Sequence, residues 1–264
     1  MSRASTSAQE RICPEPADVI RLGQVALAFG RVNRITRHED GTTPESDTDH
    51  TVMLGLIACA LAERWYPHLN RGLVAEYALV HDLVEVHAGD TPTLSIDAAG
   101  AAAKEQREQE AAQRLEDEFI GSLPWVPLMI TAYEARTTPE ARFVRAVDKL
   151  LPKITHLLND RATLIEQGIT RAELEASWNR QADALTGYAS DFPELLSLCT
   201  DLVAAVAAGY DGPNPKDGTG DPSERACRMC GCTENNACWP PCWWIGADLC
   251  SACPAGTGLV GSTR

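Results

Sequence analysis

Apolar residues recur with a helical period along most of the chain, from about residue 16 to residue 210. No stretch in this region alternates apolar and polar positions as a half-buried strand does, so we expect no strand. The pattern therefore predicts an all-α domain. Its helices are expected at residues 16–32, 48–66, 72–88, 98–121, 125–135, 138–160, 170–186 and 191–209.

Two of these helices have recognisable N-terminal signals. Thr138 can cap a helix whose first position is Pro139, where the absent amide hydrogen is not needed. Thr170 and Glu173 have the spacing of a capping box, in which each side chain bonds the other residue's backbone amide. Helices are therefore expected to begin at these two points.

The apolar pattern stops after Tyr210. The following stretch, DGPNPKDGTGDPSER, is rich in Gly, Pro and Asp and lacks large apolar residues, so residues 211–225 are expected to form a flexible linker. A small Cys-rich module with its tail is expected at residues 226–264, and residues 1–15 are expected to be an N-terminal tail. The predicted architecture is thus a helical domain at 16–210 followed by a small module.

The charge balance excludes one broad class of partner. The formal net charge is −14 at pH 7, which argues against a basic face that binds nucleic acid through counterion release. A small anionic substrate stays compatible, because a bound metal and a few local bases can dominate the field inside a pocket. No apolar run reaches the roughly 18–20 residues of a membrane span, and the N-terminus lacks a signal-peptide core. We therefore expect a soluble, cytoplasmic protein with no membrane partner.

The stretch YALVHDLVEVHAGD, residues 77–90, places ionisable groups within an apolar helical pattern. His81 and Glu85 are four positions apart and would share one helical face, whereas Asp82 would project about a hundred degrees away. His50 and Asp148 interrupt two other apolar helices in the same way. Such residues can be satisfied core pairs, but burying several of them without compensation is costly. Imidazole and carboxylate together suit a divalent ion such as Mn, Co, Fe, Ni or Zn, with positions left for water and a phosphate oxygen.

Four segments resemble a known family in order and spacing: ESDTDHTVMLGLIACALAE, ALVHDLVEVHAGDTPT, KEQREQEAAQRL and YEARTTPEARFVRAVDKL. They resemble the YfbR-like 5′-deoxynucleotidases among the HD-domain phosphohydrolases, to which a phage dATP triphosphohydrolase is also similar, over about residues 22–159. The resemblance implies an HD-domain helical bundle that assembles as a dimer or higher homo-oligomer. It also implies a divalent metal (Mn, Co, Mg, Fe, Ni or Zn) with the ligands His50, His81, Asp82 and Asp148.

The same resemblance implies catalytic roles for Glu85 and Asp90. This acidic pair is expected to position or activate water and to manage the proton of the leaving group. Attack on phosphorus needs a carboxylate within hydrogen-bond reach of the attacking water, which agrees with that role. Gly89 would permit a tight turn that directs Asp90 back to the site.

Four basic residues are candidates for phosphate binding. Arg34 matches the family's Arg upstream of the first ligand His, and Arg145 lies about one helical turn before Asp148. Lys104 and Arg107 are weaker candidates, since a solvated helix with i,i+4 ion pairs explains them equally well.

One position departs from the family. Ile35 stands where the deoxynucleotidases commonly have a Trp, so sugar and base discrimination do not carry over to this chain. The remaining histidines match no ligand position and are expected to be surface or structural residues: His38, His68, His87 and His156.

Seven of the ten cysteines fall in the last forty residues. Two CxxC knuckles, Cys227–Cys230 and Cys250–Cys253, are separated by 19 residues, which is a strong signal for a structural zinc site of zinc-ribbon type. A redox dithiol and an iron–sulfur cluster are the alternatives. Because such a short module can bury only a small hydrophobic core, metal binding would supply most of its folding free energy.

The role of this module is open. Residues 225–264 contain three Arg against one Glu and one Asp, which is too little positive charge for strong nucleic-acid binding. Docking to a partner or subunit, structural packing and base stacking by tryptophans are the alternatives, the last being the weakest. Three further cysteines could be unligated or could hold another ion: Cys232, Cys238 and Cys242. The tryptophans of the module are Trp239, Trp243 and Trp244.

Two cysteines in the helical domain, Cys59 and Cys199, lie in apolar helical patterns and are expected to be small buried hydrophobic residues.

Three functions are compatible with these features. The leading hypothesis is metal-dependent release of phosphate from deoxynucleoside 5′-monophosphates, with a nucleotide as the small-molecule substrate. The first alternative is cleavage of dATP to nucleoside and triphosphate by the same site. The second is a non-catalytic zinc-ribbon adaptor, which would bind metal tightly without turnover.

Overall fold

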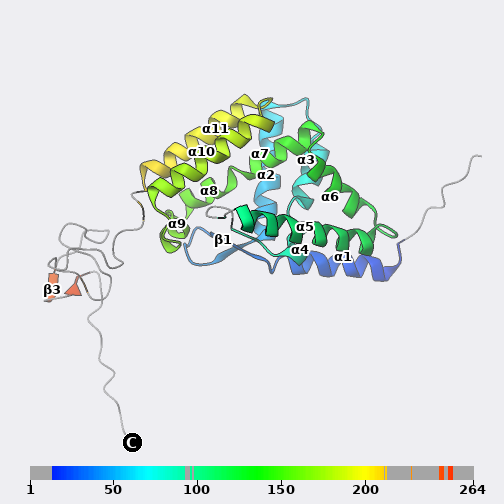
Figure 1. Cartoon of the computed structure of the whole chain (residues 1–264), viewed down its shortest axis with the longest axis horizontal. Helices are drawn as coiled ribbons and strands as arrows, with labels where there is room; N and C mark the ends of the chain where they lie inside the picture. Colours follow the sequence, from blue (N-terminus) through cyan, green and yellow to red (C-terminus); the bar gives the residue numbers. More distant parts are fainter. Residues whose placement is uncertain are drawn as a thin grey trace, which may run out of the picture. The chain divides into compact units, whose positions relative to one another are not determined.

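The computed structural model describes residues 14–92, 96, 98–210, 212, 227, 244–246 and 249–251. The chain divides into two compact units, Met1–Gly212 and Pro213–Arg264. Among the described residues, the first unit is almost entirely helical, as predicted (Figure 1). Its helices are α1 (Pro16–Phe29), α2 (Asp47–Trp65), α3 (Arg71–Val80), α4 (Glu85–Ala88), α5 (Ala98–Phe119), α6 (Trp125–Ala135), α7 (Pro139–Asp148), α8 (Leu151–Leu158), α9 (Ala162–Glu166), α10 (Arg171–Tyr188) and α11 (Pro193–Ala208).

The two predicted helix starts are confirmed. The Thr138 side chain accepts a hydrogen bond from the Ala141 amide, with Pro139 at the first helical position. Thr170 and Glu173 form the reciprocal capping box at the start of α10. Both caps satisfy amide groups that have no partner within the helix.

The expectation of no strand before residue 210 was wrong. A short hairpin of β1 (Asn33–Arg37) and β2 (Pro44–Ser46) joins α1 to α2, with antiparallel pairing. Its turn is stabilised by Asp40, whose carboxylate accepts hydrogen bonds from the backbone amides of Thr42 and Thr43. The strands are too short and too irregular in burial to give an alternating pattern, so periodicity could not reveal them.

The predicted helix at residues 72–88 is broken. Helix α3 ends at Val80, residues 81–84 form a turn, and α4 begins at Glu85. In this turn the Leu83 amide donates to the Val80 carbonyl, and the Glu85 amide donates to the Asp82 carbonyl. Both bonds join residues three apart, as in a 3₁₀-helix, which is wound more tightly than an α-helix. His81 and Glu85 therefore do not share one continuous helical face.

The predicted helix at residues 138–160 is also two helices. Helix α7 ends at Asp148 and α8 begins at Leu151 with Pro152 in its first turn, where a proline is tolerated but cannot continue a preceding helix. Helix α9 was not predicted, and the expected helix at 16–32 ends at Phe29. The break after α7 places Asp148 at a helix end.

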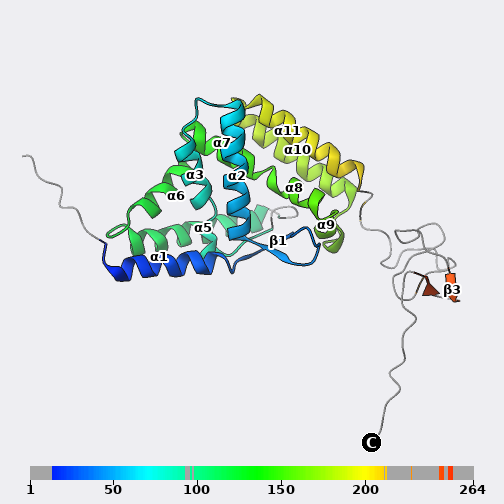
Figure 2. The ribbon, with the colours of Figure 1, turned by 180° about the vertical axis from the view of Figure 1, so that it is seen from behind.

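The main core surrounds α2, which runs through the middle of the helical unit in both views (Figures 1 and 2). Tyr66, Phe143 and Phe192 pack edge to face with ring centroids 5.1–5.4 Å apart, a favourable aromatic geometry. Cys199 is buried in this core and Cys59 packs against it, as expected of small hydrophobes. Helices α10 and α11 lie side by side and enclose a smaller cluster around Leu174 and Trp178.

The described part of the second unit contains one antiparallel pair, β3 (Trp244–Gly246) and β4 (Leu249–Cys250). The predicted linker at 211–225 lies outside the described residues except for Gly212. Within the described ranges, no helix combines the length and apolar character that crossing a membrane requires.

Candidate metal and substrate site

Three ionisable side chains from separate helices meet inside the first unit. His50 belongs to the second turn of α2, His81 follows the last residue of α3, and Asp148 is the last residue of α7. All three are buried, and each offers one ligand atom within 4.8 Å of the others. Two imidazoles and a carboxylate form a donor set that suits a divalent transition metal.

The ring of His81 is oriented by the backbone. Its Nδ1 lies 2.8 Å from the carbonyl oxygen of Ala78, and because a carbonyl only accepts, Nδ1 carries the hydrogen. This leaves Nε2 as an acceptor. Nε2 lies 3.0 Å from Asp82 Oδ2 but is buried without a hydrogen bond. A buried ring nitrogen with a free lone pair fits a metal ligand.

His50 lies between two carboxylates. Its Nε2 lies 2.9 Å from Asp148 Oδ1 and its Nδ1 lies 3.2 Å from Glu45 Oε1. Burial would lower the pKa of His50, but its hydrogen bonds to Asp148 and Glu45 raise the pKa to about 9. Both ring nitrogens of His50 therefore face carboxylates, and His50 would bind a metal ion only in its deprotonated form.

Sequence reasoning missed Glu45. It lies in β2, is buried, and also accepts a hydrogen bond from Thr36 Oγ1 of β1. Its position five residues before His50 gave no signal, because the contact depends on the hairpin that periodicity did not reveal. A carboxylate behind a ligating imidazole fixes the ring orientation and increases its basicity.

Asp82 borders the cluster of three. Its Oδ2 accepts a hydrogen bond of 2.8 Å from Arg34 Nη1 and lies 3.0 Å from His81 Nε2. The structure therefore brings His50, His81 and Asp148 together and places Asp82 beside them, bound to Arg34.

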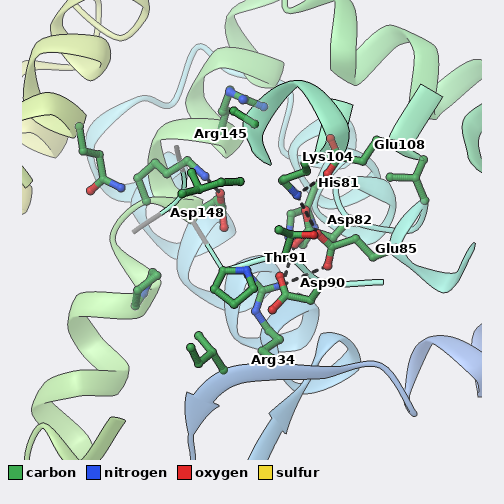
Figure 3. A pocket seen from close by; sticks show the side chains of 18 of the residues that line it. Arg34, His81, Asp82, Glu85, Asp90, Thr91, Lys104, Glu108, Arg145 and Asp148 are labelled. Atoms are coloured by element: carbon green, nitrogen blue, oxygen red, sulfur yellow. Dashed lines mark hydrogen bonds and ion pairs between the residues drawn. The ribbon is translucent and has the colours of Figure 1, made fainter. Parts of the chain in front are cut away.

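Arg34, in β1, links several carboxylates in the interior. Its Nη1 lies 3.1 Å from Asp47 Oδ1, 2.8 Å from Asp82 Oδ2 and 3.7 Å from Glu85 Oε2. Burial would lower its pKa, but the surrounding carboxylates, Asp82 and Asp90 foremost, raise the pKa above its ordinary value. Figure 3 shows Arg34 directed toward Asp82, Glu85 and Asp90. Arg34 is thus a fixed cation within the site.

Glu85 and Asp90 both line the same cavity as His81. Glu85 is 3% exposed, and its Oε2 has no hydrogen-bond partner among the described residues. Burial, together with the negative charges of Asp82 and Asp90, raises the pKa of Glu85 to about 9. Gly89 has φ 73° and ψ 150°, a conformation essentially confined to glycine, which turns the chain toward Asp90.

The predicted basic residues divide into two groups. Lys104 lines the cavity, where its Nζ lies 3.4 Å from Glu85 Oε1 and also binds Glu108. Arg145 lines the cavity and makes no ion pair within the described part of the chain. Arg107 is exposed and does not line the cavity; it donates to Oγ1 of Thr91, a lining residue, at 2.8 Å and to the Ala103 carbonyl. Figure 3 shows Arg145 well apart from Arg34, whereas Lys104 lies close to Glu85, which Arg34 also contacts.

The cavity has a volume of about 1070 Å³ and extends past the three-residue cluster along α8. Ile35 lines it beside Arg34. His156, expected as a surface or structural residue, is buried and lines the cavity, and burial lowers its pKa to about 4. The other histidines without a predicted role differ in exposure: His68 is exposed, and His38 and His87 are half-buried.

Comparisons with known proteins identify the family and several relatives of this chain. The family model described as HD domain matches residues 30–186. The chain is 26% identical over 198 residues to 5′-deoxynucleotidase HDDC2 of Bos taurus, covering 72% of this chain and 88% of that protein. It is 29% identical over 120 residues to 5′-deoxynucleotidase hdd1 of Schizosaccharomyces pombe, covering 40% of this chain and 54% of that protein.

The chain is also similar to a solved structure. That structure is of a predicted metal-dependent phosphohydrolase from Magnetospirillum magnetotacticum MS-1, with a TM-score of 0.59 and 26% sequence identity. The match covers 73% of this chain and 95% of that chain.

Proposed function

Since the chain belongs to the HD-domain family and is a metal-dependent phosphohydrolase, we propose that it releases phosphate from deoxynucleoside 5′-monophosphates. The observation that carries this proposal is the convergence of buried His50, His81 and Asp148 within 4.8 Å of one another, at a cavity that His81 and Asp148 line and that is large enough for a nucleotide. The two relatives named 5′-deoxynucleotidase support the choice of substrate.

The proposed metal ligands are His50, His81, Asp82 and Asp148. The convergence of three of them within 4.8 Å supports this set, as does the position of Asp82 at 3.0 Å from His81 Nε2. A divalent ion (Mn, Co, Mg, Fe, Ni or Zn) would neutralise the phosphoryl oxygens and lower the pKa of water.

We assign the proton transfers to Glu85 and Asp90. The buried carboxyl of Glu85 has a raised pKa, so it can hold a proton at neutral pH and give it to the oxygen of the departing nucleoside. Asp90 would accept a proton from the attacking water. The contacts of Arg34 and Lys104 with Glu85 keep this carboxyl in position.

Arg34, Arg145 and Lys104 are the proposed substrate-binding cations. Arg145 is the best placed to take a phosphate oxygen, because it lines the cavity and makes no ion pair among the described residues. Arg34 is shared among carboxylates and would act on the substrate mainly by orienting Asp82 and Glu85.

The test uses purified protein with Mn²⁺ or Co²⁺, or with EDTA, against deoxy- and ribonucleoside mono- and triphosphates. We expect orthophosphate from deoxynucleoside monophosphates, lost with EDTA and absent in Asp148→Ala. Intact triphosphate from dATP would instead assign the triphosphohydrolase activity. No product from any substrate at full metal occupancy would contradict the proposal and leave a metal-retaining adaptor as the better account.

For the second unit we propose a structural zinc bound by Cys227, Cys230, Cys250 and Cys253. Cys227 and Cys250 are buried, and the Cys250 amide donates a hydrogen bond of 3.3 Å to Cys227 Sγ, a contact that stabilises a thiolate. The other two proposed ligands lie outside the described residues, as do Cys232, Cys238 and Cys242. The proposed domain limits are 16–210 and 226–264, joined by a linker at 211–225.

We also propose that the chain acts in the cytoplasm as a dimer or higher homo-oligomer. An apolar hollow of about 290 Å³ on the helical unit, bordered by exposed Val52, Leu79 and Trp125, supports self-association. Light scattering on Val52→Asp would test it, since a charge at this hollow should shift an oligomer toward monomer.

A further inference from the structure

The cavity contains a second region that the phosphate chemistry does not use. One face of α8 lines it, because positions 152, 153 and 156 recur at helical spacing. Helix α10 supplies further lining residues, two of which contact Lys153 of α8. We call this region the α8–α10 lobe and define it by Pro152, Lys153, His156, Ser177, Trp178 and Gln181.

Lys153 sets the polar geometry of the lobe. Its side chain is almost fully buried at 1% exposure, and its Nζ donates to the Lys149 carbonyl at 2.8 Å and to Gln181 Oε1. Nζ also lies 5.5 Å from the centroid of the Trp178 ring. No carboxylate pairs with this ammonium among the described residues, so its role is to hold neutral groups.

The contact with Lys153 determines how Gln181 is turned. An ammonium group only donates hydrogen bonds, so Gln181 must direct its carbonyl oxygen toward Lys153. The amide nitrogen, with its two hydrogens, is therefore the end left for another partner. Within the described part of the chain, it has none. Gln181 thus supplies donors to whatever occupies the lobe.

Two further observations point to a flat ligand. The side chain of Trp178 lines the lobe and offers an aromatic surface. His156 is 6% exposed, and its Nδ1 is buried without a hydrogen-bond partner in the described residues. An aromatic surface beside unpaired polar groups is the combination that binds a nucleobase, whose faces stack and whose edges form hydrogen bonds.

The lobe is continuous with the phosphate end of the cavity. Lys149, directly after Asp148, lines the same cavity and connects the three-residue cluster with Lys153. The lining residues from α5 and α6 include the carboxylates of Glu105, Glu108 and Glu134 and the ring of Tyr133. Trp178, in the lobe, is the one tryptophan among the described residues that line the cavity. A nucleotide whose phosphate lies at the three-residue cluster would therefore reach a tryptophan ring in the lobe.

We propose that the α8–α10 lobe is the nucleobase subsite, and that Gln181, oriented by Lys153, selects bases that present a ring carbonyl over bases that present an amine. This inference deepens the proposed function and rests on it. Uracil, thymine and guanine carry such a carbonyl, whereas cytosine and adenine carry an amine at the corresponding position. An amine facing the amide hydrogens of Gln181 would leave both donors unpaired.

The test compares dUMP with dCMP. At the same ring carbon, uracil carries a carbonyl group and cytosine carries an amine. Gln181→Glu replaces the donor edge by acceptors and keeps the contact with Lys153. We expect the ratio of kcat/KM for dUMP over dCMP to fall about tenfold or more, the effect of losing one hydrogen bond and creating an unfavourable contact. Gln106→Glu, on the exposed face of α5, is the matched control and should leave the ratio unchanged. An unchanged ratio in Gln181→Glu overturns the proposal.

A second measurement does not depend on turnover. Unphosphorylated deoxyuridine should quench tryptophan fluorescence, and Trp178→Phe should remove this quenching, whereas Gln181→Glu should weaken deoxyuridine binding relative to deoxycytidine. If the wild type hydrolyses no nucleotide but shows this binding pattern, the subsite stands and the proposed function fails. If it hydrolyses nucleotides but neither variant alters base preference or binding, the proposed function stands and the subsite is wrong.

Discussion

Glu45 Oε1 lies 3.2 Å from Nδ1 of His50, at the ring nitrogen opposite the one that faces Asp148. The carboxylate is buried and is itself held by Thr36, so it keeps the imidazole in one orientation. The hairpin that carries Glu45 thereby acts on the proposed metal site without contributing a ligand.

Removing this carboxylate should weaken metal binding. In Glu45→Gln the amide cannot increase the basicity of His50, so affinity for Mn²⁺ or Co²⁺ should fall about ten- to a hundredfold. Competition with a chelator of known affinity measures the change. Glu39→Gln removes an exposed carboxylate of the same hairpin and is the control. Equal affinity in Glu45→Gln and the wild type would refute the orienting role.

Arg34→Met should reduce both stability and activity. The substitution leaves Asp47, a fully buried carboxylate, without its cation, which should lower the free energy of unfolding by about 3–5 kcal/mol. Since Arg34 also holds Asp82 and Glu85, kcat/KM should fall about a hundredfold or more. Urea unfolding and phosphate release measure the two effects.

A double variant separates these effects. Arg34→Met combined with Asp47→Leu removes the unpaired carboxylate as well, so part of the lost stability should return while activity stays low. The exposed Arg31 provides the control Arg31→Met, which should match the wild type in both measurements. Recovery of activity in the double variant would show that Arg34 serves stability alone.

Gly89→Ala should impair activity through the backbone. A Cβ at this position would meet no atom within 4 Å, but φ is 73°, so the substitution strains the turn by about 1–3 kcal/mol or moves it. Either result displaces Asp90, and kcat should fall. Gly23→Ala in α1 also meets no atom within 4 Å and lies in a helix, where it should stabilise by up to about 1 kcal/mol and leave kcat intact. Full activity in Gly89→Ala would contradict the proposed role of Asp90.

His156 should make the fold sensitive to acid. Burial lowers its pKa from 6.5 to about 4, so between these values the unfolded state binds more protons than the folded state. Stability therefore falls as pH decreases from about 6.5 to about 4, by about 3 kcal/mol from this group. Lys153 also lowers this pKa and Glu45 opposes the shift.

The measurement is urea unfolding of the wild type and His156→Gln at pH 7 and pH 4. The variant lacks the titrating group, so its stability relative to the wild type should rise by about 3 kcal/mol on acidification. Parallel losses of stability in the two proteins would show that His156 titrates as it does in the unfolded chain.

Zinc content tests the second unit. If Cys227 and Cys250 are zinc ligands, Cys227→Ser should lose bound zinc, because four thiolates close a structural site and three hold it less tightly. Since the helical unit is compact on its own, metal-dependent phosphate release should remain. Elemental analysis of protein purified without chelators measures the change, with Cys59→Ser as the control. Unchanged zinc content in Cys227→Ser would exclude this ligand set.

Helical periodicity and capping residues were sufficient to predict most of the first unit. Helices α2, α5, α6, α10 and α11 lie close to their predicted ranges, because their apolar stripes and the cap at Thr170 are local features. The hairpin and the breaks after Val80 and Asp148 were missed. Short strands give no period, and a tight turn inside an apolar stretch retains the same apolar residues as a helix.

The sequence by itself determined the helical class, the ordered motif with its candidate ligands, and the separation of a Cys-rich module. Each of these follows from the pattern of residues that are close together in the sequence. Only the tertiary structure decided that His50 and Asp148, 98 positions apart, meet beside His81, that Glu45 orients one imidazole, and that Lys153 turns the amide of Gln181. These relationships depend on how helices and the hairpin pack against one another. Side-chain distances between packed elements are set by that packing, and a one-dimensional pattern contains no record of them.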